Sequence, residues 1–268
     1  MSKLGKGIPN MGNTCYIASI LQTLRYSRSL VYQLREHNTK DDTVLMKFFI
    51  ELLYDGASTT TFNAFVQRLS MDSKEFRLLR QCDAHELYLY LIDNFYEKNK
   101  EYKNPFMGKL ESTIECSVCQ HQSVTETPFI SLSLEMDPHK VLSVEDMIRK
   151  FCSIEELDDP IDCEHCKKKQ PSAKILRIKE MPEILVIHLK RFTGLLKNNI
   201  PVSINKTYKQ YKLYAMVNHI GGSMGGHYTA ACRRKNGEWR MCNDLFVTEL
   251  NAIPNQSPAP YILFYSTI

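Results

Sequence analysis

The spacing of the apolar residues changes once along this chain, and this change limits the fold more than any other feature. Up to about residue 104, apolar residues recur every three or four positions, as they do on the buried face of a helix; Tyr16, Ile20 and Leu24 are an example. Beyond Asn104-Pro105, apolar and polar residues alternate and β-branched residues become frequent, which is typical of strands. We therefore predict an α+β fold, helical first and sheet-rich second.

The same patterns place the individual elements. Helices are predicted from about residue 15, over 44–53, 62–69 and 83–98, and over 143–154, where Ser143 and Asp146 fit a capping box. Strands are predicted over 110–116, 122–134, 174–179, 184–192, 211–218, 227–233, 238–242 and 261–265. No repeat and no Gly/Ser linker divides the sequence, so we predict one domain over residues 1–268.

Composition excludes several classes of function. The net charge is only +4 and the basic residues are spread along the chain, which argues against nucleic-acid binding. The first residues do not resemble a signal peptide and no apolar run approaches the length of a membrane span. We expect a soluble protein of the cytoplasm or nucleus that is not secreted. Nine cysteines in such a protein favour metal binding or catalysis over disulfides.

Four of these cysteines form two Cys-x-x-Cys pairs, Cys116/Cys119 and Cys163/Cys166. Such pairs place two thiolates on one side of a tetrahedral zinc ion. Because 44 residues separate the pairs, we expect them on two hairpins that one structural zinc ion joins. His165, inside the second pair, is an alternative ligand, but four thiolates already close the coordination shell.

A catalytic constellation is predicted from the two ends of the chain. Cys15 begins a helix, whose N-terminus favours a thiolate. His227 follows two glycines and would act as the general base, and Asn243, 16 residues later, would orient its ring. Asn10 is close enough in sequence for its amide to assist the backbone N–H groups of Thr14 and Cys15 in binding an oxyanion.

These segments resemble the signature sequences of the ubiquitin-specific proteases. Residues 7–16, Gly-Ile-Pro-Asn-Met-Gly-Asn-Thr-Cys-Tyr, are similar to that family's Cys box, and Gly225-Gly226-His227-Tyr228 with Trp239 and Asn243-Asp244 is similar to its His box. Residues 81–87 and 185–192 match two intermediate signatures, the cysteine pairs fall between them, and residues 261–265 resemble the final strand.

The resemblance implies a papain-like thumb–palm–fingers fold. The thumb would cover about residues 1–104, the zinc-bearing fingers 105–172 and the palm 173–268. It further implies a thiol-dependent deubiquitinase that hydrolyses the bond after the C-terminal Gly-Gly of ubiquitin through a thioester on Cys15. Ubiquitin and ubiquitinated proteins would be its partners, and we expect a monomer.

Family resemblance also assigns residues to a narrow channel for the ubiquitin tail: Gln81, Asp83, Glu86, Phe192 and Tyr228. The two carboxylates suit the arginines of that tail. From the sequence alone, however, Asp83 could instead cap a helix, Glu86 could complete a local box, and Phe192 could be a core residue.

The match departs from the family at two positions. Ala18 replaces the usual Asn, and Cys82 stands in a Gln-Gln-Asp signature that reads Gln-Cys-Asp here. The third catalytic residue of the family is Asn or Asp, so Asp244 is an alternative to Asn243, which we favour. Two other functions remain open: a protease for a ubiquitin-like modifier, and an inactive relative that binds ubiquitin without cleaving it.

Overall fold

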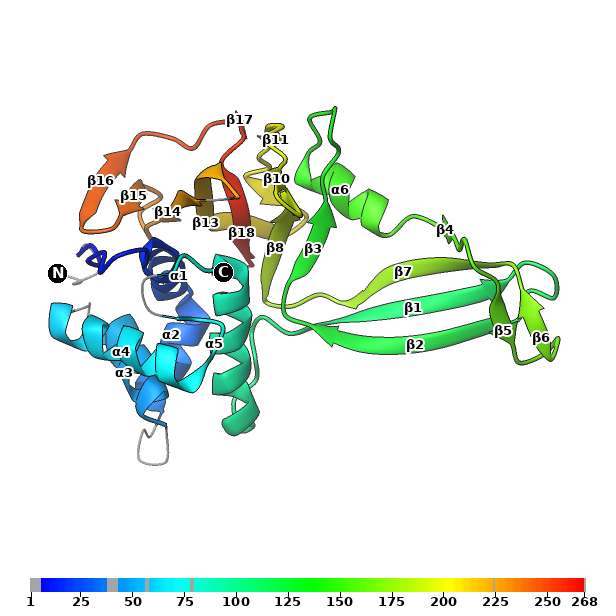
Figure 1. The fold of residues 1–268 in the computed structure, drawn as a ribbon, viewed down its shortest axis with the longest axis horizontal. Helices are drawn as coiled ribbons and strands as arrows, with labels where there is room; N and C mark the ends of the chain where they lie inside the picture. The colour runs from blue at the N-terminus through cyan, green and yellow to red at the C-terminus, as the bar shows by residue number, and fades with distance from the viewer. Residues whose placement is uncertain (1–5, 38–42, 56–57, 78–79, 224, 268) are drawn as a thin grey trace.

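The computed structural model of the protein describes residues 6–37, 43–55, 58–77, 80–223 and 225–267. It has three parts: a group of helices, a large twisted sheet above them, and a long β-arm that extends to one side (Figure 1). The predicted α+β class is confirmed, with the helices first along the chain. None of the helices in the described segments is both long and apolar enough to cross a membrane.

The helical part consists of five helices. They are α1 (Cys15–Arg25), α2 (Arg28–Glu36), α3 (Val44–Asp55), α4 (Thr59–Asp72) and α5 (Ala84–Lys98). Every residue of α1 is buried, because this helix lies between the other helices and the sheet. This central position buries the polar residues of the helix as well as its apolar ones, and it fixes the N-terminal end of α1 at the boundary between the two parts.

The large sheet follows the order β16-β15-β14-β13-β18-β8-β3, with β12 (Thr207–Tyr208) paired to β13. Its strands are β3 (Leu132–Glu135), β8 (Ile184–Lys190), β13 (Tyr211–Gly222), β14 (Gly225–Arg233), β15 (Trp239–Asn243), β16 (Phe246–Leu250) and β18 (Pro260–Ser266). Only β3 and β8 run parallel among these pairs. Short ladders join β9 (Phe192–Thr193) to β10 (Leu196–Lys197) and β11 (Val202–Ser203) to β17 (Gln256–Ser257).

The β-arm is a second sheet, in the order β2-β1-β7-β4. It contains β1 (Gly108–Cys116), β2 (Gln122–Phe129), β4 (Glu155–Glu156) and β7 (Ser172–Glu180). A small hairpin, β5 (Ile161–Cys163) and β6 (Lys168–Gln170), lies at its far end (Figure 1). Seven of the eight residues of β2 are exposed, so the arm has no thick apolar core of its own.

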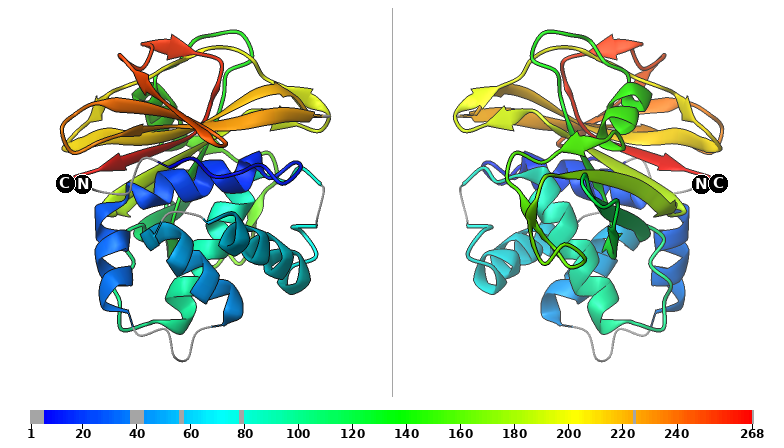
Figure 2. Two further views of the ribbon diagram at one scale, coloured as in Figure 1. Left: turned by 90° about the vertical axis from the view of Figure 1, so that its left-hand side faces the viewer. Right: turned by 90° about the vertical axis from the view of Figure 1, so that its right-hand side faces the viewer.

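Two hydrophobic clusters cover opposite faces of the large sheet, and β8 shows how one strand serves both. Ile184 and Val186 pack into the cluster that contains α1–α5. The intervening Leu185 and Ile187 pack into the second cluster, with α6 (Val144–Phe151). Figure 2 shows the five N-terminal helices together below the sheet. Alternating side chains of a strand point to opposite faces, so a strand buried on both sides is apolar throughout.

The structure differs from the sequence prediction in three respects. Helix α2 was not predicted, because it has few apolar residues and only Leu30 and Leu34 are buried. The strand predicted over 122–134 is two strands in different sheets, β2 in the arm and β3 in the large sheet. The sheets also do not divide at residue 172: β7 belongs to the arm, whereas β3 and α6 pack with the large sheet. The capping box of Ser143 and Asp146 is confirmed.

Candidate active site between helices and sheet

Cys15 is the first residue of α1 and is 3% exposed. The loop before it is organised by Asn10, whose Oδ1 accepts hydrogen bonds from the N–H groups of Gly12 (3.0 Å) and Thr14 (3.2 Å). Gly12 and Asn13 both have positive φ angles, of 91° and 58°, which closes this loop into a tight turn. The turn therefore presents the Cys15 thiol at a helix N-terminus.

The Asn10 amide also reaches the sheet. Its Nδ2 donates to Asp244 Oδ2 at 3.1 Å, and Ile8 N donates to the Asp244 carbonyl at 2.8 Å. Asp244 has a φ of 51° in the tight turn between β15 and β16. The segment that carries the nucleophile is thus held by the turn that follows Asn243.

His227 lies on β14, and its Nε2 is 2.6 Å from Asn243 Oδ1 at the end of β15. An amide oxygen only accepts hydrogen bonds, so this contact assigns the ring proton to Nε2 and leaves the Nδ1 lone pair free of that proton. Asp244 Oδ2 is farther from the same nitrogen, at 4.0 Å. Of the two candidates for the third residue, Asn243 therefore makes the direct hydrogen bond, and Asp244 holds the Asn10 loop.

Gln81 links the helical part to the strand that carries His227. Its Oε1 accepts from Gly226 N at 2.9 Å, and its Nε2 donates to the Gly226 carbonyl. The same Nε2 is 3.7 Å from Cys15 Sγ. A Cβ on Gly226 would lie 2.3 Å from His219 Nε2, so only glycine fits this position. The side-chain amide of Gln81 thus contacts both Cys15 on α1 and Gly226 on the strand that carries His227.

Asp83 and Glu86 lie at the start of α5. Asp83 is the N-cap: its Oδ1 accepts from the N–H groups of His85 (2.6 Å) and Glu86 (3.4 Å), and its Oδ2 accepts from the Tyr261 hydroxyl. This carboxylate is therefore occupied by structural hydrogen bonds, as the capping interpretation predicted. Glu86 is exposed, and burial of part of its carboxylate, with the nearby Asp83, raises its pKa above the usual value.

The two predicted aromatic residues take different positions. Phe192 is half-buried and its ring meets His219 edge-on, with 5.2 Å between ring centroids. Tyr228 is only 4% exposed and packs against His219 and Tyr261 in the core. Phe192 can therefore form a wall of a channel, whereas Tyr228 supports it from behind.

The two departures from the family pattern lie near this site. Ala18 is buried in the helix core, where a polar side chain would need a hydrogen-bond partner. Cys82 is half-buried, and its thiol lies 3.3 Å from the Glu75 carbonyl and 3.6 Å from that of Arg80. Cys82 also hydrogen-bonds the side chain of Tyr16, so it links the segment that precedes α5 to α1.

His85 and His188 lie within the two intermediate signatures, residues 81–87 and 185–192, and the sequence predicted no role for them. Their rings stack with centroids 3.9 Å apart, His85 on α5 and His188 on β8. Ser131 Oγ lies 2.8 Å from His85 Nε2, and Ser133 Oγ lies 2.9 Å from His188 Nδ1. Burial lowers the pKa of His85 to about 4 and that of His188 to about 2. The neutral pair joins the helices to the sheet.

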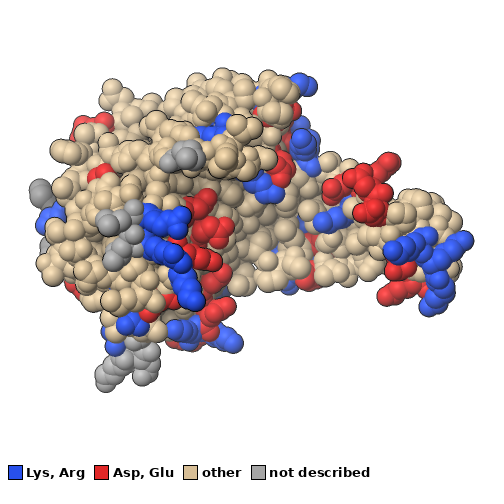
Figure 3. Space-filling view, in the orientation of Figure 1, with Lys and Arg blue, Asp and Glu red and all other residues tan. Residues whose placement is uncertain are grey.

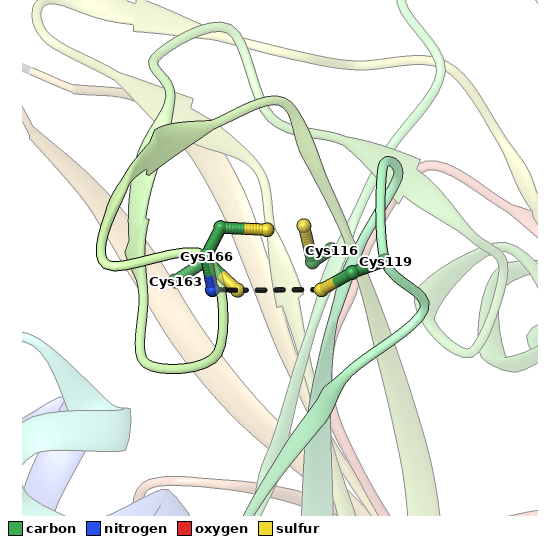
Figure 4. A group of neighbouring side chains, drawn as sticks. All are labelled: Cys116, Cys119, Cys163 and Cys166. Atoms are coloured by element: carbon green, nitrogen blue, oxygen red, sulfur yellow. Dashed lines mark hydrogen bonds between the residues drawn. The ribbon is translucent and has the colours of Figure 1, made fainter.

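The four paired cysteines meet at the far end of the β-arm. Their sulfur atoms all lie within 4.8 Å of one another, and Figure 4 shows the side chains pointing toward one another from two turns. Zn–S bonds of about 2.3 Å in a tetrahedron require S···S distances of about 3.8 Å, so this group fits a zinc ion. Contact with the Cys119 thiol raises the pKa of Cys166 to about 12, and a divalent cation would reverse this effect. His165 does not belong to the group and stacks on His121.

Comparison with known proteins identifies the family. The sequence profile of the family described as "Ubiquitin carboxyl-terminal hydrolase" matches residues 6–265. The chain belongs to this family. Relatives in the ubiquitin carboxyl-terminal hydrolase family include "Ubiquitin carboxyl-terminal hydrolase 2" of Bos taurus and "Ubiquitin carboxyl-terminal hydrolase 25" of Arabidopsis thaliana. Each is 30% identical over 97% of this chain, but the match covers 54% and 47% of their lengths. The chain thus spans about half the length of these relatives.

Solved structures of the ubiquitin carboxyl-terminal hydrolase family share the fold. A structure titled "Structure of the SAGA Ubp8/Sgf11/Sus1/Sgf73 DUB module bound to ubiquitin aldehyde" has a TM-score of 0.82 and 25% sequence identity. The match covers 97% of the present chain and 69% of the matched chain in that structure. The predicted ubiquitin-specific protease fold is confirmed. Helices α1–α5 correspond to the thumb, the large sheet to the palm, and the β-arm to the fingers.

Proposed function

We propose that this protein is a thiol-dependent deubiquitinase that cleaves the amide bond after the C-terminal Gly-Gly of ubiquitin. The observation that carries the proposal is the 2.6 Å contact between His227 and Asn243, beside a helix that begins with Cys15. The contact leaves Nδ1 as the basic nitrogen of His227. Cysteine, histidine and an orienting amide are the three groups that an acyl-transfer site with a thiol nucleophile requires.

The reaction follows from these positions. His227 Nδ1 takes the thiol proton of Cys15, and the thiolate attacks the carbonyl carbon of the terminal glycine. The C–N bond breaks as the imidazolium returns the proton to the leaving amine, which leaves a thioester on Cys15. Water then gives a proton to His227 while its oxygen attacks the thioester carbon. The C–S bond breaks, the imidazolium returns the proton to the Cys15 sulfur, and the carboxylic acid is released.

The oxyanion would be stabilised at the N-terminus of α1. The N–H of Cys15 has no partner within its helix, because it is among the first four of that helix. Thr14 N already donates to Asn10 Oδ1, so the predicted contribution of Thr14 would require that bond to open. Asn10 Nδ2 has two hydrogens, and Asp244 accepts one of them. The second hydrogen is the one that could serve the oxyanion.

Charge on the helical part supports a basic ligand. On the face shown in Figure 3, acidic side chains gather in a band over α5. Glu86, Asp93 and Glu97 are exposed on this helix, and burial together with Glu97 raises the pKa of Asp93. The band suits the arginines of the ubiquitin tail. Phe192 and Gln81 would border the final Gly-Gly, whose lack of side chains allows close approach to Gly226.

The cysteine group of the fingers would hold one structural zinc ion. A closed set of four thiolates leaves no position for a substrate, so the ion would stabilise the arm without entering the reaction. The arm depends on such support because β2 is almost wholly exposed. We further propose that the chain acts as a monomer on ubiquitinated proteins in the reducing environment of the cytoplasm or nucleus.

The decisive experiment uses C-terminal electrophile probes made from ubiquitin and from its relatives. We expect the ubiquitin probe to form a covalent adduct with the protein and none with Cys15→Ala. An adduct with a ubiquitin-like modifier but not with ubiquitin would mean that the substrate is that modifier rather than ubiquitin. Failure of every probe, with ubiquitin binding retained in Cys15→Ala, would instead identify an inactive ubiquitin-binding relative.

A further inference from the structure

A cavity of about 600 Å³ lies at the end of α1 opposite to Cys15. Ten residues of helix separate Cys15 from Arg25, which corresponds to about 15 Å. Figure 2 shows α2 near the C-terminal end of β18 in both views, and residues of both elements line the cavity. Its walls come from the end of α1, the start of α2, β13, the turn after β14, and β18; they comprise residues 25–28, 31, 32, 35, 212–214, 233–236 and 266. It is therefore separate from the candidate active site.

The lining of this cavity is strongly cationic. Seven of its fifteen residues are arginine or lysine and none is aspartate or glutamate, although the whole chain has 34 basic and 30 acidic residues. If the basic and acidic residues of the chain were evenly distributed, the cavity lining would contain about as many carboxylates as cations. The cationic residues are Arg25, Arg28, Arg35, Lys212, Arg233, Arg234 and Lys235.

Two of the lining cations show different surroundings. Arg234 has Glu238 at 3.7 Å, on the exposed surface. Arg25 is buried and donates from Nε and Nη2 to the carbonyl oxygen of Leu52, at 2.9 and 2.6 Å, rather than to a carboxylate. Burial lowers the pKa of Arg25 to about 10, so it is still charged at neutral pH. A positive field inside a concave site concentrates anions.

Two buried hydroxyl groups complete the wall. Ser27 is 1% exposed and is the N-cap of α2, yet its side chain makes no capping hydrogen bond. Ser27 and Tyr214 lie within reach of each other, and their side-chain hydrogen bond lowers the pKa of Tyr214 against the larger effect of burial, which raises it. Neither hydroxyl has a further hydrogen-bond partner in the described segments. Two hydroxyls that share one hydrogen bond still have one O–H to donate, and an oxygen-rich ligand would accept it. The N-terminus of α2 adds a partial positive charge at the same place.

We propose that this cavity binds a small ligand that carries several phosphate groups. The cavity volume is in the range of small-molecule sites, and a cavity of this size is too small for a folded partner. Arginines suit phosphate oxygens through paired N–H donors, and lysines add point charges around them. Tyr26 and Tyr32, which also line the cavity, provide flat walls for the carbon skeleton of such a ligand. The site does not depend on the proposed protease activity.

Sodium tripolyphosphate is a suitable probe, and calorimetric titration at physiological salt measures its affinity. Lys212→Ala/Lys235→Ala removes two exposed cations from the cavity wall, and the matched control Lys100→Ala removes an exposed lysine elsewhere. We expect saturable 1:1 binding to the wild type and the control, and at least tenfold weaker binding to the double variant. Ser27→Ala should weaken binding at least threefold, because it removes a hydroxyl from the cavity wall.

The other outcomes would overturn the proposal. Equal affinity in the double variant and the control would mean that the anion binds elsewhere on the surface. Tight binding of a poly-glutamate peptide without tripolyphosphate binding would assign the cavity to an acidic protein segment. Affinity for single-stranded oligonucleotides that rises with their length, and exceeds that for tripolyphosphate, would indicate a nucleic-acid surface instead.

Discussion

Gly7 lies against the backbone of the turn that contains Asp244, and Gly7→Ala tests this contact. A Cβ at this position would lie 2.1 Å from the carbonyl oxygen of Leu245 and 2.5 Å from that of Asp244. Carbon–oxygen contacts normally begin at about 3.3 Å, so the two segments must separate by about 1.2 Å. Both neighbours are backbone atoms, which cannot rotate away as a side chain can.

The separation would break two hydrogen bonds, from Ile8 N to the Asp244 carbonyl and from Asn10 Nδ2 to Asp244 Oδ2. At about 1 kcal/mol each, their loss lowers the free energy of unfolding by about 2 kcal/mol, or about 5 °C in melting temperature. Asn243 precedes this turn and Cys15 follows the displaced loop. A shift of about 1 Å between them should reduce kcat/KM by roughly 100-fold.

The assay is hydrolysis of a fluorogenic ubiquitin C-terminal amide, together with thermal unfolding. Gly222→Ala is the matched control, because nothing lies within 4 Å of a Cβ added there and its φ is not in the left-handed region. Gly222→Ala should retain both stability and activity. If Gly7→Ala behaves like Gly222→Ala in both assays, the contact between the N-terminal segment and the Asp244 turn does not position the site, and our reasoning is wrong.

Three further predictions concern the third catalytic residue, the histidine pair and the metal site. Asn243→Ala should lower kcat about 100-fold, because the His227 ring loses the hydrogen bond that orients it. Asp244→Asn should change kcat less than about threefold. Steady-state kinetics of both variants would show the reverse order if Asp244 were the orienting residue. Burial lowers the pKa of both His85 and His188, so the unfolded state binds more protons and stability falls as the pH drops below about 6.5. Burial also lowers the pKa of His219 to about 4, so three histidines contribute. The loss is about 2 kcal/mol per histidine between pH 7.5 and 5.0, and urea unfolding of His188→Asn should show about two thirds of the total; an unchanged pH slope would contradict the buried pair. Purified protein should contain one zinc ion by mass spectrometry, and a strong chelator should lower its melting temperature; zinc-free protein with an unchanged melting curve would refute the metal site.

Features that depend on neighbours in the sequence were predictable. The period of apolar residues separated the helical thumb from the sheets, and the capping box at Ser143 and Asp146 followed from local hydrogen bonding. The Cys-x-x-Cys pairs predicted that four sulfur atoms would meet, because each pair already places two of them together. Helix α2 escaped prediction because the contacts of Leu30 and Leu34 with the rest of the core, rather than a local pattern, stabilise it.

The sequence by itself determined the α+β class, the zinc-type cysteine pairs and the residue types of the candidate triad, because each of these is carried by spacing or by a short motif. Only the tertiary structure showed that Asn243 rather than Asp244 contacts the His227 ring, because a difference of 1.4 Å in distance to one ring nitrogen depends on how the turn after β15 bends. It also decided that Asp83 caps α5, that Tyr228 is buried, and that Gln81 binds Gly226. The contact between Gln81 and Gly226 joins segments 145 positions apart, whose approach is set by packing of helices against the sheet. The Asp83 cap is local, and the sequence had left it open as an alternative to a substrate contact.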